Sequence, residues 1–452
     1  MLDERIINFL QNAGPVFFVT PTVDRAIGLE DLLPDFHIVC TQLSDGNELL
    51  RERGVKIFVS SSAGKNSGKI LSDRAVIDYI RDKSAGKKAN IITFKPSPMI
   101  EKICEREGFR YLGNRAELNR IWEDKVKFAE ITSSLGLKNA DSRVLKIEAD
   151  TARDLPGSSD FSDGRRYVVQ FPYGYSGNST HIAGSKEELA GILEDNIGRK
   201  AKIADFIEGD TYTLDVCIGP FGLLMSQPIF QITGFTELNR NPLGTCGNDY
   251  AFGKKLDDRY RTDIAGSVAK IADKMAGEGY SGVLGFDFVI GEEGAHIIEV
   301  NPRLVGSIPA ITKLQLGAGE IPFLLLQMLS FMDFDFSSFG KLGTRQDFDF
   351  SQLIFRNTRD VPVRIGKTLV SGIYSYRDGD LEFVRSAYCA EAGMKEDEFF
   401  LNAVPAGAVI DQDMEYADMQ LPRGIMETRK SFEPDISELK DMIIKNIILD
   451  EE

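Results

Sequence analysis

Cysteine is scarce in this sequence and is not spaced for cross-linking. The 452 residues include five widely separated cysteines and no C-x-x-C pair: Cys40, Cys104, Cys217, Cys246 and Cys389. A small, odd number of scattered cysteines excludes a disulfide framework and gives no zinc-site spacing. We therefore expect a reduced, cytoplasmic protein.

Long apolar runs and excess positive charge are also lacking. The longest apolar run, at 323–332, is interrupted by Gln327 and Ser330, whereas a membrane helix needs about 18 apolar residues. The N-terminus begins with Asp3, Glu4 and Arg5 and has no apolar region typical of a signal peptide. The net charge of −16 repels phosphate backbones. These absences predict neither a membrane nor a nucleic acid as partner.

The order of the apolar segments predicts the fold class. Short apolar runs at 15–19, 37–40, 56–59 and 90–94 are separated by helix-length stretches, a pattern typical of a parallel sheet with crossover helices. The pattern becomes β-rich at 167–311 and again at 351–420, and 331–350 is predicted to be a linker. We expect a multidomain protein of α/β and α+β class.

Two amphipathic helices are predicted from their apolar stripes. One spans 116–135, and its stripe includes Phe128, Thr132 and also Lys125, which therefore lies on the buried side. A lysine there usually extends its ammonium group to the surface. The other is the C-terminal helix, for which Asp435 is the expected N-cap and Glu438 completes a capping box.

A β-hairpin is predicted at 285–303, around the turn sequence Gly-Glu-Glu-Gly. If residues 292–294 form a three-residue loop with Gly294 in the left-handed region, Ile290 pairs with His296. Counting back along both strands then places Asp287 directly opposite Glu299.

Asn301 and Arg303 would lie on the same face of the hairpin as these two carboxylates, because side chains alternate along a strand. Two opposed carboxylates repel each other and would weaken an ordinary sheet. A divalent cation removes that repulsion, and magnesium prefers one or two carboxylates together with substrate phosphates. We predict a metal site formed by Asp287, Glu299 and Asn301.

This hairpin resembles the magnesium-binding signature of the ATP-grasp superfamily, in which an Asp or Glu precedes a Glu-x-Asn-x-Arg on the next strand. The resemblance covers about 15–330. It implies a Rossmann-like domain at 1–114 and two ATP-grasp lobes at 115–205 and 206–335. Residues 336–452 lie outside the resemblance and are predicted from their own pattern to be a β-rich C-terminal region with a terminal helix. Arg303 would be the catalytic arginine.

The resemblance also implies an ATP-binding set. Lys125, in the sequence Glu-Asp-Lys, is similar to the lysine that contacts ATP in this superfamily. A strand ending at Gln170 is followed by a glycine-rich segment that resembles the loop covering the phosphates, with Ser176 and Gly177 as binding residues.

The segment Asp205, Phe206 and Ile207 resembles the hinge between the two lobes, whose backbone contacts adenine. Two positions depart from the family pattern. Gln170 stands where a lysine is usual, so it can donate a hydrogen bond without neutralising charge. Thr211 stands where a glutamate usually holds the ribose. Both changes bear on nucleotide preference and turnover.

The superfamily's chemistry implies an ADP-forming ligase. With ATP and Mg²⁺, or Mn²⁺ in its place, a small carboxylate would become an acyl-phosphate that an amine attacks to give an amide. An amino acid, a small peptide or a specialised metabolite is the expected substrate, and a homodimer the expected assembly.

Two alternatives remain open. One is biotin-carboxylase-like carboxylation, although the chain lacks an Ala-Met-Lys-Met carrier motif and the Gln-Val-Glu-His that follows the arginine in biotin carboxylases. The other is a non-catalytic, ATP-binding regulator, which Gln170 favours.

Overall fold

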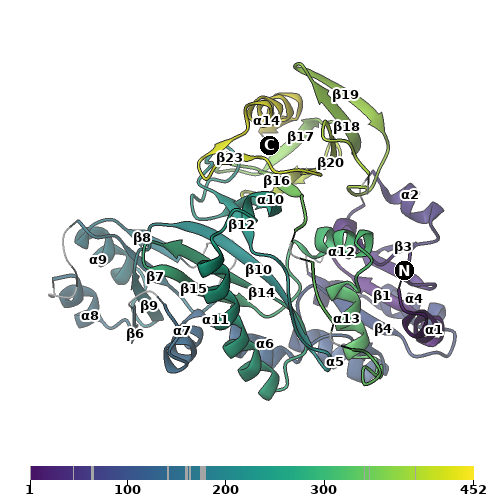
Figure 1. The fold of residues 1–452 in the computed structure, drawn as a ribbon, viewed down its shortest axis with the longest axis horizontal. Coiled ribbons are helices and arrows are strands. Elements are labelled where there is room, and N and C mark those ends of the chain that lie inside the picture. Colours follow the sequence, from purple (N-terminus) through teal and green to yellow (C-terminus); the bar gives the residue numbers. More distant parts are fainter. Residues whose placement is uncertain are drawn as a thin grey trace.

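The protein is described by a computed structural model that covers residues 2–43, 45–62, 66–139, 142–157, 161, 164–173, 180–340, 342–345, 347–391 and 393–451. Figure 1 shows a central sheet region with a small lobe around α8 and α9 on one side and the N-terminal sheet on the other. The C-terminal strands and α14 lie above the central region. No helix in these described ranges combines the length and apolar character that crossing a membrane requires.

The N-terminal part is a five-stranded parallel sheet in the order β3-β2-β1-β4-β5. The predicted parallel sheet is therefore confirmed. Its strands are β1 (Val16–Val19), β2 (Phe36–Cys40), β3 (Lys56–Val59), β4 (Asn90–Thr93) and β5 (Arg110–Tyr111). The helical segments around them are α1 (Glu4–Asn12), η1 (Val23–Ala26), α2 (Asn47–Glu52), α3 (Ser67–Ser72), α4 (Arg74–Ser84) and α5 (Pro98–Glu107).

The single helix predicted at 116–135 is wrong, because the structure has two. Helix α6 (Ala116–Glu123) ends before Asp124, whose extended ψ of 106° begins α7 (Lys125–Ser134). The Asp124 carboxylate accepts hydrogen bonds from the backbone N–H groups of Val126 and Lys127. An aspartate that caps in this way satisfies the free donors of a helix start. Lys125 is therefore the first residue of a new helix.

The small lobe is a four-stranded antiparallel sheet in the order β6-β9-β7-β8. One face packs under α8 and α9 around Val169, Leu189 and Ile203. Alternate residues of β7 and β9 must face the other way, toward α7, which also packs against β9. The elements are β6 (Ser142–Lys146), α8 (Ala149–Asp154), η2 (Leu155–Gly157), β7 (Tyr167–Gln170), β8 (Thr180–Ala183), α9 (Lys186–Glu194) and β9 (Lys200–Asp205).

An 11-stranded sheet forms the centre of the molecule and extends into the C-terminal region. Its first part contains β10 (Asp210–Gly219), β11 (Gly222–Met225), β12 (Ile229–Thr233), β13 (Thr245–Asp249), β14 (Gly282–Gly291) and β15 (Gly294–Asn301). Helices α10 (Tyr250–Gly253), α11 (Asp258–Gly277), α12 (Ile308–Gly317) and α13 (Phe323–Ser330) accompany these strands.

The C-terminal region continues this sheet through β16 (Ser351–Arg356), which pairs with β13. At the junction Gly247 has φ +144°, and a Cβ there would lie 2.0 Å from the carbonyl oxygen of Gln352. Only glycine permits this approach. The remaining strands of the sheet are β18 (Gly372–Arg377), β19 (Asp380–Arg385), β20 (Glu398–Ala403) and β22 (Glu415–Leu421).

Two small sheets and the last helix complete the C-terminal region: β17 (Val363–Lys367), β21 (Val409–Ile410), β23 (Met426–Thr428), β24 (Ser431–Phe432), α14 (Pro434–Asn446) and β25 (Ile448–Glu451). The capping box predicted for α14 is wrong. The helix begins two residues earlier than predicted, with Glu433 at the N-cap position, and no side chain caps it. Asp435 instead pairs with Arg423, and Glu438 accepts a hydrogen bond from Tyr376. The carboxylates of Asp435 and Glu438 therefore interact with residues of other elements instead of capping the helix.

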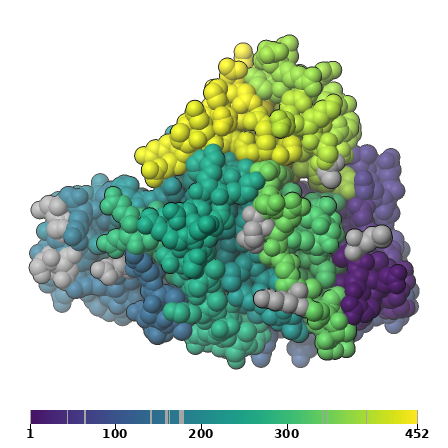
Figure 2. Space-filling view, in the orientation of Figure 1, coloured from purple at the N-terminus to yellow at the C-terminus, as the bar shows by residue number. Residues whose placement is uncertain are grey.

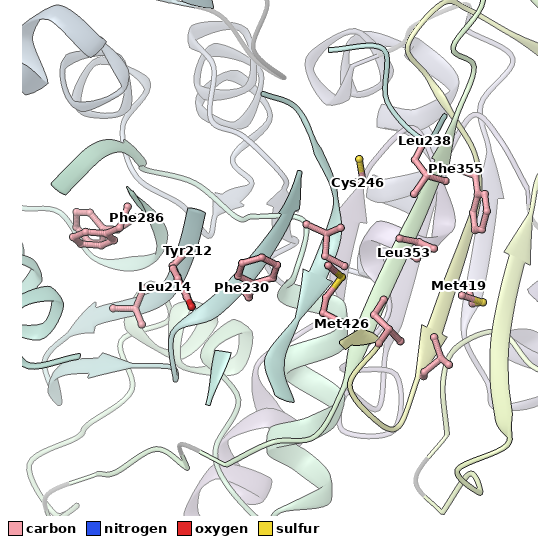
Figure 3. Close-up of a cluster of buried hydrophobic side chains, with 14 of the residues drawn as sticks. Tyr212, Leu214, Phe230, Leu238, Cys246, Phe286, Leu353, Phe355, Met419 and Met426 are labelled. Atoms are coloured by element: carbon pink, nitrogen blue, oxygen red, sulfur yellow. The ribbon is translucent and has the colours of Figure 1, made fainter. Parts of the chain in front are cut away.

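One hydrophobic core runs beneath the central sheet and the C-terminal strands. Figure 3 shows Tyr212, Leu214 and Phe230 at one end of this core and Leu353, Phe355 and Met419 at the other. The predicted linker at 331–350 has neither helix nor strand in its described residues, yet Phe336, Phe348 and Phe350 are buried. In Figure 2 the C-terminal residues (yellow) rest directly on the central region (teal).

Candidate active site

The hairpin of β14 and β15 has the predicted carboxylate pair but not the predicted turn. Gly291 pairs with Gly294, so the turn has two residues, and Ile290 faces Ala295 rather than His296. The predicted three-residue loop is therefore wrong. Counted from this turn, Asp287 would face Ile298.

A β-bulge restores the pairing of the carboxylates. The register shifts between Asp287 and Phe288, so that Phe288 pairs with Ile297 and Asp287 with Glu299. Ile298 is the extra residue, and such an insertion moves every later side chain by one position. Asp287 and Glu299 thus lie opposite each other, as predicted, for a reason that the turn sequence does not contain.

A hydrogen-bond network joins Asp287 to Gln231, Asn301 and Arg303. The Asn301 amide donates to Asp287 Oδ2 at 3.0 Å, and the Gln231 amide donates to Asp287 Oδ1 at 3.1 Å. Arg303 donates through Nη2 to Asn301 Oδ1 at 3.2 Å. Burial raises the pKa of Asp287 and lowers the pKa of Arg303. Asp287, Asn301 and Arg303 are therefore in one connected polar cluster, and Glu299 lies beside it as the strand partner of Asp287.

Lys125 reaches this cluster from helix α7. Its ammonium group forms an ion pair with the Glu299 carboxylate, and its side chain is only 11% exposed. Burial lowers the pKa of Lys125 to about 8, although Asp287 and Glu123 attract the charged form. The Lys125 backbone N–H donates to Pro172 O at 3.0 Å, which ties the start of α7 to the end of β7. A lysine with this pKa remains mostly charged at neutral pH.

Gln170 lies at the end of β7, where it is buried. Its amide donates to the Thr180 hydroxyl at 3.4 Å. In register it faces Thr180 on β8 and Lys202 on β9. Ser176 and Gly177, predicted to bind the phosphates, lie outside the described residues.

The predicted hinge residues follow β9 and approach the tip of the hairpin. Asp205 ends β9, the Phe206 backbone N–H donates to Arg166 O at 2.9 Å, and the Arg166 guanidinium lies 3.9 Å from the Phe206 ring centre. A Cβ on Gly291 would lie 2.8 Å from Ile207, so the hinge packs against the hairpin turn. Sequence position alone gave no sign of this contact.

Thr211 is the second residue of β10 and makes no hydrogen bond to Asp287 or Glu299. Its hydroxyl donates to Gln231 O at 3.2 Å, and its strand partner is Val289. The neighbouring Gln231 side chain, in contrast, reaches Asp287. Gln231 is a member of the cluster that sequence reasoning missed, because a single glutamine in a β-rich stretch carries no motif.

A cavity of about 1120 Å³ opens beside the cluster. Asp287, Asn301 and Arg303 line it, whereas Lys125, Glu299, Gln170 and the hinge residues are not among its walls. Its other walls come from the N-terminal domain, with Arg25, Phe94 and Lys95, and from the C-terminal sheet, with Arg356, Phe400, Glu415 and Asp418. The cavity therefore needs three parts of the chain that are far apart in sequence.

The far wall of the cavity carries paired charges. Glu415 lies 3.0 Å from Arg356 and 3.7 Å from Arg25. Asp418 accepts hydrogen bonds from Gln352 and Gln420, each at 3.0 Å. Burial, and then repulsion from Asp24 and Glu415, raises the pKa of Asp418 to about 7. This wall can therefore offer hydrogen-bond donors and acceptors to a polar ligand. None of these residues forms a sequence motif.

The donor set of the hairpin fits a magnesium ion that arrives with phosphates. Within the described residues, no group of three or more His, Cys, Asp and Glu side chains is placed to hold a metal. Magnesium in nucleotide sites takes one or two carboxylates and leaves its other positions to phosphates and water. The opposed carboxylates of Asp287 and Glu299, with the Asn301 amide oxygen nearby, meet that requirement.

Comparison with known proteins decides the identity of this region. A family model for the ATP-grasp domain matches residues 123–307. The chain contains an ATP-grasp domain. The matched range of this domain includes every predicted site residue from Lys125 to Arg303.

Relatives of known sequence match about half of the chain. The arginine-specific carbamoyl phosphate synthase large chain of Bacillus subtilis (strain 168) is 23% identical over 225 residues, which are 49% of this chain and 20% of that protein. The L-propargylglycine–L-glutamate ligase of Streptantibioticus cattleyicolor is 24% identical over 260 residues, 52% of each protein. The chain thus spans about a fifth and about half of the lengths of these relatives.

The fold of the whole chain is similar to that of solved ATP-grasp proteins. The biotin carboxylase–βγ-ATP complex from Campylobacter jejuni superposes with a TM-score of 0.63 over 97% of this chain and 92% of that one, at 11% identity. An identity this low supports the fold alone. The mixed fold class, with a parallel N-terminal sheet before the ATP-grasp domain, is confirmed.

Asp215, in β10 beneath the ATP-grasp site, should make stability depend on pH. It is fully buried, its Oδ1 accepts from Ser307, and its Oδ2 has no partner among the described residues. Burial raises its pKa to about 7. Between about pH 4 and pH 7 the unfolded carboxyl is ionised while the folded one keeps its proton, so stability falls as pH rises.

Asp215→Asn has the shape of the protonated acid and cannot ionise. We expect its free energy of unfolding, relative to wild type, to rise by roughly 1.4 kcal/mol per pH unit over this range. Denaturant unfolding followed by fluorescence of the buried Trp122 measures it. Asp380→Asn, an exposed site on β19, is the control. A constant difference between Asp215→Asn and wild type at all pH values would contradict the expectation.

Proposed function

We propose that this protein is an ADP-forming ligase that activates a small carboxylic acid as an acyl-phosphate and joins it to an amine. The observation that carries the proposal is the position of the hairpin cluster. Asp287, Asn301 and Arg303 lie on the wall of a cavity of about 1120 Å³, and the Lys125–Glu299 ion pair adjoins the same cluster. The groups that bind phosphate and those that bind the acid would thus lie next to each other at the wall of this cavity.

The resemblance to ATP-grasp proteins suggests a role for each predicted site residue. Lys125 and Gln170 would contact the phosphates, Ser176 and Gly177 would cover them, and the backbone at Asp205, Phe206 and Ile207 would hold adenine. Asp287, Glu299 and Asn301 would hold Mg²⁺, or Mn²⁺ in its place. When bound, the metal neutralises charge on the transferred phosphoryl group.

Arg303 is the residue proposed to act on the acid substrate. Its side chain is partly buried, it lines the cavity, and Glu123 lies 4.0 Å from its Nε. A planar guanidinium can hold two oxygens of a carboxylate or phosphate at once. Arg303 would therefore orient the acid and stabilise the acyl-phosphate that forms from it.

The similarity to an amino-acid ligase supports an amino acid or small peptide as substrate. The matching protein is named for joining L-propargylglycine to L-glutamate, and the match covers half of each chain. The polar far wall of the cavity, with Gln352, Asp418 and Gln420, would suit an amine or a second polar group.

Carboxylation is a second candidate, favoured by the fold similarity to biotin carboxylase. In that reaction bicarbonate is the acid and biotin the nucleophile. The two proposals differ in which acid stimulates ATP cleavage, so one assay separates them.

A hydroxylamine trap tests the ligase proposal without knowledge of the amine. An acyl-phosphate reacts with hydroxylamine to give a hydroxamate and phosphate, so amino acids and other small acids can be screened with Mg²⁺ and ATP. We expect one acid class to give equal amounts of ADP and hydroxamate. The control omits the acid.

Other products would point elsewhere. AMP and pyrophosphate would contradict the proposal, because they indicate adenylate chemistry. ADP formation that requires bicarbonate and biotin would favour carboxylation. ATP binding without ADP release from any acid would favour a regulator.

A further inference from the structure

Lys202 is a buried cation with no anionic partner in the part of the chain that the structure describes. The residue is 3% exposed, and among the described residues no ion pair or hydrogen bond engages its ammonium group. An unpaired buried charge is costly, and natural proteins seldom retain one without a partner or a ligand. No motif singles out Lys202, which lies in an ordinary strand sequence, Lys-Ala-Lys-Ile-Ala-Asp.

The face of the sheet on which Lys202 lies is that of the nucleotide site. Its strand neighbours Ala201 and Ile203 belong to the core under α8 and α9. Since side chains alternate, Lys202 faces the opposite side, together with its register partner Gln170. Helix α7, which begins at Lys125, packs against the same strand.

Two lysines and one amide therefore converge. Lys125 begins the helix that packs against β9, and burial, followed by repulsion from Lys125, lowers the pKa of Lys202 to about 8. Glu299 already balances the charge of Lys125. No described carboxylate balances the charge of Lys202, so this part of the site has one positive charge available for an anion.

The anion can be identified by the position of β9. The strand runs from Lys202 to the hinge at Phe206, about 13 Å away at strand rise. A nucleotide with its base at the hinge would direct its phosphates back along β9 toward Lys202. Gln170, on the neighbouring strand, is neutral, so it can donate a hydrogen bond to a phosphate but cannot balance its charge.

We infer that Lys202 is a phosphate-binding residue that supplies, from β9, the positive charge that Gln170 on β7 does not provide. The inference rests on the proposed nucleotide site and adds a residue to it. Lys202 would contact the phosphates of ATP, whereas Gln170 would donate a hydrogen bond to the same group. Lys202 would therefore discriminate ATP and ADP from adenosine.

The test compares three variants by calorimetric titration with Mg-ATP and with adenosine. Lys202→Met should weaken ATP binding by about tenfold or more, because a charged contact is lost, and leave adenosine binding nearly unchanged. Lys200→Met, two residues earlier on β9 and exposed, is the matched control and should bind ATP as wild type does. The double variant Gln170→Lys/Lys202→Met places the positive charge on β7 instead of β9, directly opposite its original position, and should recover most of the affinity for ATP.

Thermal unfolding separates a binding role from a structural one. Removal of an unpaired buried charge should leave the melting temperature of Lys202→Met unchanged or higher. A lower melting temperature with equal losses for ATP and adenosine would overturn the inference, as would unchanged ATP affinity. The proposed ligase activity fails separately: ATP affinity that depends on Lys202, without any hydroxamate, would refute the ligase and keep the inference. A wild-type protein that does not bind ATP would refute both.

Discussion

Glu299→Gln is expected to lower acid-dependent ADP formation by about a hundredfold or more. The substitution keeps the shape of the side chain and removes one of two opposed carboxylates, so the proposed magnesium site loses charge where the phosphoryl group is transferred. It also removes the ion-pair partner of Lys125. Steady-state ADP release over a range of Mg²⁺ concentrations measures the effect, and higher Mg²⁺ should recover part of it.

The fold should survive this change, since Asp287 and Glu123 also attract Lys125. Thermal unfolding of the variant checks this point. Glu293→Gln is the matched control, because Glu293 lies exposed in the turn of the same hairpin. Wild-type turnover by Glu299→Gln at limiting Mg²⁺ would show that Glu299 does not hold the metal.

Arg303→Lys is the second change with a large expected effect. We expect hydroxamate formation to fall about a hundredfold, while the dissociation constant for ATP changes about threefold or less. Lysine keeps the charge but cannot bridge two oxygens, and it would also lose the bonds from the guanidinium to Asn301 Oδ1 and Leu304 O. Single-turnover hydroxamate assays and ATP titration separate these two quantities.

Arg115→Lys, at the exposed start of α6, controls for a general effect of exchanging arginine for lysine. If Arg303→Lys formed hydroxamate at the wild-type rate, Arg303 would not contact the acid. If ATP binding fell as much as turnover, Arg303 would act on the nucleotide instead of the acid.

The local sequence determined much of the fold because its signals depend on near neighbours. The short apolar runs at 37–40 and 56–59, each between helix-length stretches, predicted two strands, and both strands are confirmed. The start of α5 also depends on near neighbours. The Ser97 side chain accepts a hydrogen bond from the backbone N–H of Ile100, three residues later, and Pro98 occupies the first helical position. The alternation of side chains likewise places Glu299 and Asn301 on one face of β15, whereas the pairing of Asp287 with Glu299 depends on the bulge.

Tertiary structure decided the points where two local preferences compete. Asp124 could sit inside one long helix or cap a second, and packing of α7 against β9 and the bond from Lys125 N–H to Pro172 O accompany the cap. Asp435 could cap α14, but Arg423 offers a charged partner that is distant in sequence. A sequence pattern contains no information about such distant partners.

The residues of the candidate site also fall into two groups, those predictable from local sequence and those positioned by tertiary structure. The residues from Asp287 to Arg303 were predictable because they lie on one hairpin, where period and spacing place side chains on a face. The bulge at Ile298, the reach of Gln231 to Asp287, the position of Lys202 opposite Gln170 and the cavity wall of Arg356 and Asp418 were not predictable. Each of these depends on which strand lies beside which, and only the packed sheet order determines that.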